Sequence, residues 1–185
     1  METNSFINEK MFDLVMEDRE IREHILQILF PDKNFKLTED KTYNKTNPIQ
    51  SVIDADGKQY DVCMQPTTEQ VSDLGRQVLH YQVLLDSDAL QANNYTLLKD
   101  SIILIFCNNN TISNSYNVFQ QQDKEDPAVI LNTGSETIII NGSGKANKNS
   151  SNEFLDLLRL ICNEPVEDDP ILKKAEQIIK DNSEN

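Results

Sequence analysis

The residues with the clearest capacity for chemistry lie in the stretch DADGKQYDVCMQP, residues 54–66. Its thiol, Cys63, could act as a nucleophile or as a soft metal ligand once it is deprotonated. A nucleophilic thiol needs a base beside it, and nothing in the sequence places either histidine, His24 or His80, next to Cys63. Zinc binding needs further Cys or His residues at ligand spacing, which Cys63 lacks. We therefore interpret Cys63 as a small, semi-buried side chain.

Two short strands around a tight turn hold this cysteine. Hydrophobic residues occupy every second position from Tyr60 to Met64, which is the pattern of a strand with two different faces. The Asp56–Gly57 pair favours a hairpin turn because these residues accept a positive φ. The pattern predicts strands over about residues 49–53 and 60–65, the second ended by Pro66.

Helical periodicity dominates the regions on either side of the hairpin. Apolar spacing predicts two helices within residues 8–30, the second capped by Asp18, and one long helix over residues 67–91. Two more helices are expected near the end of the chain, the first capped by Ser151 and the second by the acidic residues 167–169.

Three further stretches are typical of strands. SIILIFC is almost wholly apolar, which indicates a strand buried on both faces, and YNVFQ and ETIIIN follow it. The order of elements predicts an α/β (α+β) fold, a mixed sheet with helices on its faces. We expect one domain over residues 1–185, with frayed tails at 1–9 and 181–185.

The charge balance excludes strong non-specific binding to nucleic acid. The chain has 31 acidic and 17 basic residues, a net charge of −14, and phosphate affinity comes mostly from Lys and Arg. The three cysteines are widely spaced and predict a reducing, cytoplasmic setting. The opening METNSFINEK lacks the pattern of a signal peptide, and the apolar run IILIFC is too short to cross a membrane.

Several stretches together resemble the PD-(D/E)XK nuclease-family transposases, also called recombination-promoting nucleases. DADGKQYDVCMQ resembles the core hairpin of that family, in which an Asp-Gly turn precedes Tyr-Asp/Asn-Val-Glu-Met-Gln. FDLVMEDREIREHILQIL resembles the opening helix pair, and HYQVLLDSDALQANNYTLLKDSIILIFC resembles the Tyr-Tyr-Gln helix and buried strand. SYNVFQQQDKEDPAVILNTGSETIIIN resembles the strand region that follows. The match covers about residues 10–180 and implies a restriction-endonuclease-like core.

The resemblance implies a magnesium-dependent DNA endonuclease whose metal ligands have been lost. Aligned without a gap from the Asp-Gly turn, the family's Asp position is Ile49 and its Glu position is Cys63, and only Gln65 remains. Mg²⁺ prefers oxygen ligands, which Ile49 and Cys63 cannot supply. Asp61 shares the strand face of Cys63 and is the one carboxylate that could substitute. We predict no catalytic residues, no metal and no cofactor, with Mg²⁺ as the alternative.

These observations favour a catalytically inactive nuclease fold that works as an acidic binding protein. The expected partner is a basic, nucleic-acid-handling protein, most specifically an RNA-guided nuclease blocked in the manner of an anti-CRISPR inhibitor. The alternatives are an endonuclease with a rearranged site and an inert partner of an active sister nuclease. A homodimer is compatible with the sequence, and no membrane partner is expected.

Overall fold

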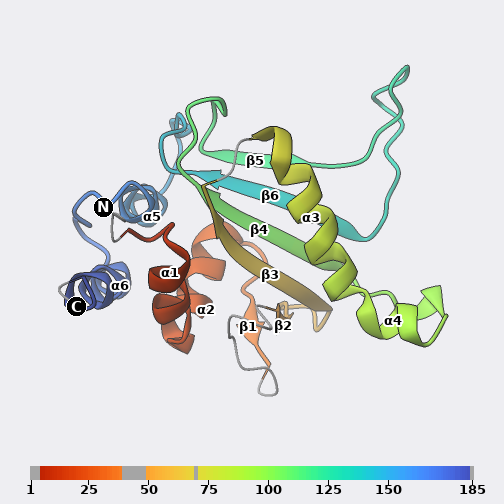
Figure 1. Ribbon diagram of the computed structural model, residues 1–185, viewed down its shortest axis with the longest axis horizontal. Coiled ribbons are helices and arrows are strands. Elements are labelled where there is room, and N and C mark those ends of the chain that lie inside the picture. Colours follow the sequence, from red (N-terminus) through yellow and green to blue (C-terminus); the bar gives the residue numbers. More distant parts are fainter. Residues whose placement is uncertain (1–4, 39–48, 69–70, 184–185) are drawn as a thin grey trace.

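A six-stranded mixed β-sheet forms the centre of the protein (Figure 1). The computed structural model describes residues 5–38, 49–68 and 71–183. Strands β3, β4 and β6 are parallel neighbours, whereas β1, β2 and β5 pair antiparallel at the two sides. The predicted mixed sheet flanked by helices is therefore confirmed. In sheet order the strands are β1 (Lys36–Leu37), β2 (Ile49–Ile53), β3 (Gln59–Thr67), β4 (Ser101–Cys107), β6 (Ser135–Asn141) and β5 (Tyr116–Phe119).

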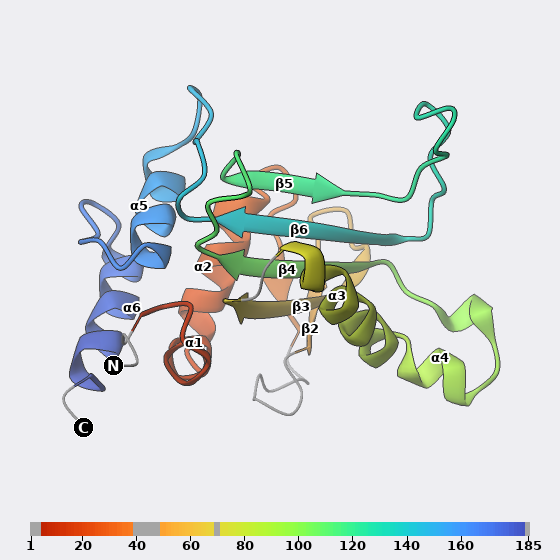
Figure 2. The same ribbon diagram turned by 45° about the horizontal axis from the view of Figure 1, so that its top comes forward.

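Helices cover the two faces of the sheet unequally (Figure 1 and Figure 2). Helices α1, α2 and α5 pack on one face of the sheet, α6 packs against these three helices, and α3 lies on the other face. The short helices α4 and η1 continue from α3 beyond the end of the sheet. The helices are α1 (Glu9–Met16), α2 (Arg19–Leu29), α3 (Val71–Leu85), α4 (Ser87–Gln91), η1 (Tyr95–Leu97), α5 (Asn152–Ile161) and α6 (Pro170–Asp181). None of the helices within the described ranges is both long and apolar enough to cross a bilayer.

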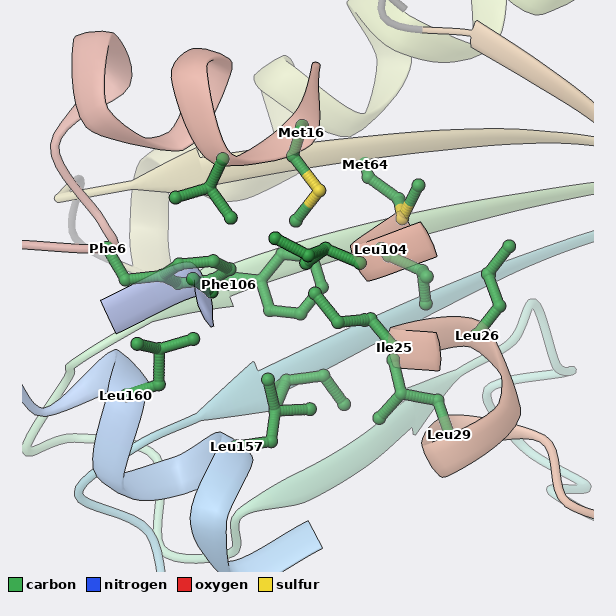
Figure 3. Packing of buried hydrophobic residues seen from close by; sticks show 14 of the residues in the cluster. Phe6, Met16, Ile25, Leu26, Leu29, Met64, Leu104, Phe106, Leu157 and Leu160 are labelled. Carbon is green, nitrogen blue, oxygen red and sulfur yellow. The ribbon is translucent and has the colours of Figure 1, made fainter. Parts of the chain in front are cut away.

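The larger core lies between the sheet and the four-helix side. All seven residues of β4 are buried, and its alternate side chains point to the two faces, as predicted for SIILIFC. Phe106 meets Phe6 and Phe12 with ring centroids 5.6 Å apart. Figure 3 shows Phe6 and Phe106 together with side chains of α1, α2 and α5. Aromatic and branched side chains from distant segments thus fix α1, α2 and α5 on this face.

The predicted helix caps are present. Asp18 accepts hydrogen bonds from the N–H groups of Glu20 and Ile21, at 3.0 and 3.3 Å. Ser151 accepts one from Phe154 N at 3.2 Å, which satisfies one of the free donors at the start of α5. Within the acidic run 167–169 it is Asp169 that caps α6.

Three boundaries differ from the sequence predictions. Strand β3 continues through Pro66 to Thr67, because beyond Cys63 its described neighbour is β4 alone and the missing N–H of proline is tolerated. The long helix ends at Leu85, where the side chains of Asp86 and Ser87 favour non-helical backbone, and α4 follows separately. The expected N-terminal tail is shorter than predicted, since Phe6 is fully buried and α1 begins at Glu9; residues 1–4 and 184–185 lie outside the described ranges.

One buried carboxylate links α5 to α6. Asp156 on α5 is 1% exposed and accepts hydrogen bonds from the backbone N–H groups of residues 167, 168 and 169 at 2.8–3.0 Å. Arg159 Nη1 lies 2.7 Å from Asp156 Oδ1. Burial alone raises the pKa of Asp156, but these hydrogen bonds outweigh burial and lower the pKa from 3.8 to about 2. The ionised side chain therefore holds the loop that starts α6.

We expect the Asp156→Asn variant to lose about 2 kcal/mol of unfolding free energy at neutral pH, because its amide cannot accept all of these hydrogen bonds. The folded-state pKa of Asp156 is depressed, so its stabilisation is present above pH 3.8 and is lost as pH falls towards about 2. Urea unfolding at several pH values measures this dependence. The matched control is Asp168→Asn, a change at an exposed neighbouring carboxylate. A variant as stable as the natural sequence at neutral pH would contradict this role.

Candidate functional site

The vestigial site implied by the sequence lies on the α3 face of the sheet. Ile49 of β2 and Cys63 of β3 are directly opposite each other in the antiparallel ladder. On the other side of β3, Ile103 of β4 is the neighbour of Cys63 in the parallel ladder. The alignment position of the family's Asp is thus beside the position of its Glu, and apolar side chains fill both.

Cys63 belongs to a closed apolar layer. It is fully buried between the sheet and α3, and burial raises the pKa of its thiol from 9.0 to about 12. At neutral pH the thiol is therefore protonated, and a protonated thiol is neither a good nucleophile nor a good metal ligand. The residues that form this layer with Cys63 are Leu74, Ile103, Ile105, Cys107 and Ile139, with Val78, Tyr81, Leu85 and Ile112 packed against them.

Gln65 is held by α3. Its Oε1 atom accepts a hydrogen bond from the hydroxyl of Tyr81 at 3.2 Å, and burial raises the pKa of that hydroxyl. Gln65 is half-buried and follows Cys63 by two residues, so the structure places both on the same face of β3. Gln65 thus links β3 to α3.

Asp61 lies in a polar row that crosses four strands. In the ladder register Ser51, Asp61, Ser101 and Ser135 are successive neighbours. Ser51 Oγ donates to Asp61 Oδ1 at 2.5 Å, and Lys99 Nζ lies 3.4 Å from Asp61 Oδ2. The one carboxylate predicted as a substitute ligand is therefore buried and already engaged with a hydroxyl and a cation.

Gln82 of α3 covers the same polar row. Its Oε1 atom accepts from Ser135 Oγ at 2.5 Å, and its Nε2 atom lies 3.4 Å from Ser101 Oγ and donates to Asp86 Oδ2 at 2.9 Å. Sequence analysis missed this network of serines and glutamine. The signal in the sequence is a serine at the start of each of the stretches SIILIFC and SETIIIN. That these serines are neighbours can be known only from the strand register.

The described residues around Cys63 do not fit a magnesium ion. Within residues 5–38, 49–68 and 71–183, no three His, Cys, Asp or Glu side chains come together as a metal site. Asp54 and Asp56 lie at the hairpin turn, where Asp54 accepts from the N–H groups of Asp56 and Lys58 at 3.0 and 2.9 Å. Near Cys63 the described oxygen atoms belong to Asp61, to serine and tyrosine hydroxyls and to the amides of Gln65 and Gln82, and Asp61 already contacts Ser51 and Lys99. Mg²⁺ prefers carboxylate oxygens, and Asp61 alone supplies them here among these residues.

The two histidines have other surroundings. His24 Nε2 lies 2.6 Å from Asp169 Oδ2 and joins α2 to the start of α6. His80 is exposed on α3, with its ring centroid 5.6 Å from that of Tyr81. The expectation that neither histidine serves Cys63 as a base agrees with these positions.

Comparisons with known proteins leave the family resemblance as an expectation. No protein family, curated protein or solved structure matches the chain.

We predict that Cys63 reacts slowly with thiol reagents in the native protein. Cys63 and Cys107 are buried, and burial raises their pKa values to about 12 and about 11, whereas Cys162 is partly exposed. Titration with a chromogenic disulfide near pH 8 should show one fast thiol, which Cys162→Ser removes, and three thiols in denaturant. Rapid modification of Cys63, located by mass spectrometry, would contradict the closed layer.

Proposed function

We propose that this protein is a binding protein built on a nuclease-like fold, and that it binds and blocks a basic, nucleic-acid-handling protein. The most specific candidate partner is an RNA-guided nuclease. The proposal is carried by the cross-strand pair of Ile49 and Cys63, an apolar side chain and a protonated thiol. By the resemblance, these are the two positions at which the nuclease family has the carboxylates that hold its metal.

The packing around this pair supports a binding role. Burial of a single unpaired carboxylate costs several kcal/mol, so a hydrolytic site must keep its acids open to a metal or to water. Here α3 closes over Cys63, and Tyr81 and Gln82 are committed to hydrogen bonds with sheet residues. The arrangement stabilises the fold and keeps Cys63 from solvent.

The charge distribution supports the choice of partner. A net charge of −14 repels nucleic acid and favours encounter with a positively charged surface. The loop between α5 and α6 exposes Glu164, Glu167 and Asp168, and the caps formed by Asp156 and Asp169 hold that loop in place. Fixed acidic groups of this kind attract a basic groove without first becoming ordered.

The first test restores the lost ligands. We expect no cleavage of supercoiled plasmid by the natural protein with Mg²⁺ or Mn²⁺, and nicking by Ile49→Asp/Cys63→Glu if the scaffold still positions both ligands. The matched control Ile49→Asn/Cys63→Gln has the same shapes without the charges, and circular dichroism confirms that each variant folds. The proposal would be overturned if the natural protein cleaved the plasmid and the Asp61→Asn variant did not. That result would favour an endonuclease with a rearranged site.

The second test measures inhibition directly. Added to an RNA-guided nuclease with a matched DNA target, the protein should slow cleavage, and the inhibition should weaken as salt is raised because screening reduces the attraction between the two surfaces. An unrelated protein of similar size and charge serves as the control. No inhibition across several such nucleases would exclude this partner class, and inhibition of a sister nuclease alone would point to the inert-partner alternative.

A further inference from the structure

Edge strand β5 has one side of its main chain unpaired. Among the described strands β5 pairs with β6 alone. Asn141 N donates to Ser115 O at 2.9 Å, and in an antiparallel ladder every second residue turns its main-chain groups to the same neighbour. Tyr116 and Val118 therefore direct their N–H and C=O groups away from β6, to the outside of the sheet. A free edge of this kind is a template for another strand.

An ordered arm, residues 120–133, follows this strand. All of its residues are exposed, yet Gln122 and Ile130 form an antiparallel bridge, and Asp123 N donates to Val129 O at 2.9 Å. Figure 2 shows the arm rising beyond the end of β5, away from the helices. Long ordered loops with apolar side chains in water commonly serve as contact surfaces. The large apolar side chains exposed on β5 and the arm are Val118, Phe119, Val129, Ile130 and Leu131.

The tip of the arm carries fixed negative charge. Asp123, Glu125 and Asp126 outnumber the single base of the arm, Lys124. Asp123 Oδ1 accepts hydrogen bonds from the N–H groups of Asp126 and Glu125, both at 2.8 Å, and these bonds lower the pKa of Asp123 below its ordinary value of 3.8. The tip is therefore acidic at neutral pH and already ordered before a partner arrives.

A hollow of the opposite charge borders the other end of β5. Its volume is about 840 Å³, and it lies between the start of β5, the end of α2 and the loop that leads from β6 into α5. The charged residues that line it are Lys145 and Lys148, and no ion pair within the described residues includes either lysine. The hollow can thus receive an acidic segment with apolar side chains. Its apolar lining consists of Ile28, Leu29, Pro31, Tyr116, Ala146 and Phe154.

The opposite charges at the two ends of β5 select a second copy of the chain as the occupant. A basic foreign segment would suit the arm but would meet the two lysines at the other end of the strand. An acidic segment or a nucleic acid would suit the lysines but would meet the acidic arm. A second β5 that runs antiparallel presents the same two ends in reverse order, so each acidic arm lies beside a basic hollow.

We infer that the protein forms a homodimer in which the two β5 strands pair antiparallel across a two-fold axis, and the arm of each subunit packs into the hollow of the other. The outward main-chain groups of Tyr116 then face those of Val118 of the partner subunit, which joins the two sheets into one. The acidic tip of each arm reaches Lys145 and Lys148 of the partner subunit, and apolar side chains of the arm cover the apolar lining. This inference does not depend on the proposed function.

Charge exchange between the arm and the hollow tests the arrangement. At micromolar concentration we expect the full chain to sediment at twice the monomer mass of 21.2 kDa. Lys145→Glu/Lys148→Glu and Glu125→Lys/Asp126→Lys should each weaken the dimer at least about tenfold, because like charges then meet at both contacts. An equimolar mixture of the two variants should dimerise again, since each arm then meets a hollow of opposite charge.

The matched control for the lysine variant is Lys36→Glu/Lys173→Glu. It changes the net charge equally, at exposed lysines of β1 and α6, and should leave the dimer intact. Circular dichroism confirms that each variant folds. A monomer at all concentrations overturns the inference, as does a dimer that neither charge variant weakens or a mixture of the two variants that stays monomeric.

The pairing of the two β5 strands has its own test. Val118→Pro removes an outward N–H group that the single chain leaves unpaired, and it should weaken the dimer at least about tenfold without unfolding the monomer. Val118→Ala shortens the same side chain but keeps the N–H group, so it should weaken the dimer much less. Equal effects of the two substitutions on the sedimentation equilibrium would overturn the strand pairing.

Discussion

The burial of β4 on both faces is the constraint on which the rest of the structure depends. Seven consecutive buried residues need apolar cover above and below the sheet, because such a strand has no polar face to present to water. Helices α1, α2 and α5 on one side supply the larger share of this cover, and α3 supplies the rest. The position of α3 therefore follows from the need to cover Ile103 and Ile105. The outer face of α3 takes no part in this cover.

The same constraint explains why the layer around Cys63 is closed. Cys63 is the neighbour of Ile103 in the parallel ladder and of Ile49 in the antiparallel one, so it lies inside the layer that α3 must seal. A carboxylate at this position would need a cation or water within that layer, whereas a thiol is simply another small apolar group there. An apolar residue and a thiol at these two positions are therefore physically consistent with a closed layer.

Local signals in the sequence predicted much of the fold and only part of the site. The hairpin follows from Asp56–Gly57, the helix starts from Asp18 and Ser151, and the central strand from its apolar run, because each depends on neighbouring residues. The row from Ser51 to Ser135 depends on the register of four strands, two of which are joined to the rest by long connections. The break after Leu85 was missed because helical periodicity continues past it in the sequence.

The proposed binding role depends on an interior without metal chemistry. The most direct test of that interior is an electron paramagnetic resonance titration of Mn²⁺ with the natural protein and with Asp61→Asn. We predict only weak binding by surface acids, identical in the two proteins, because Asp61 is engaged with Ser51 and Lys99. A saturable Mn²⁺ site that Asp61→Asn abolishes would contradict the account.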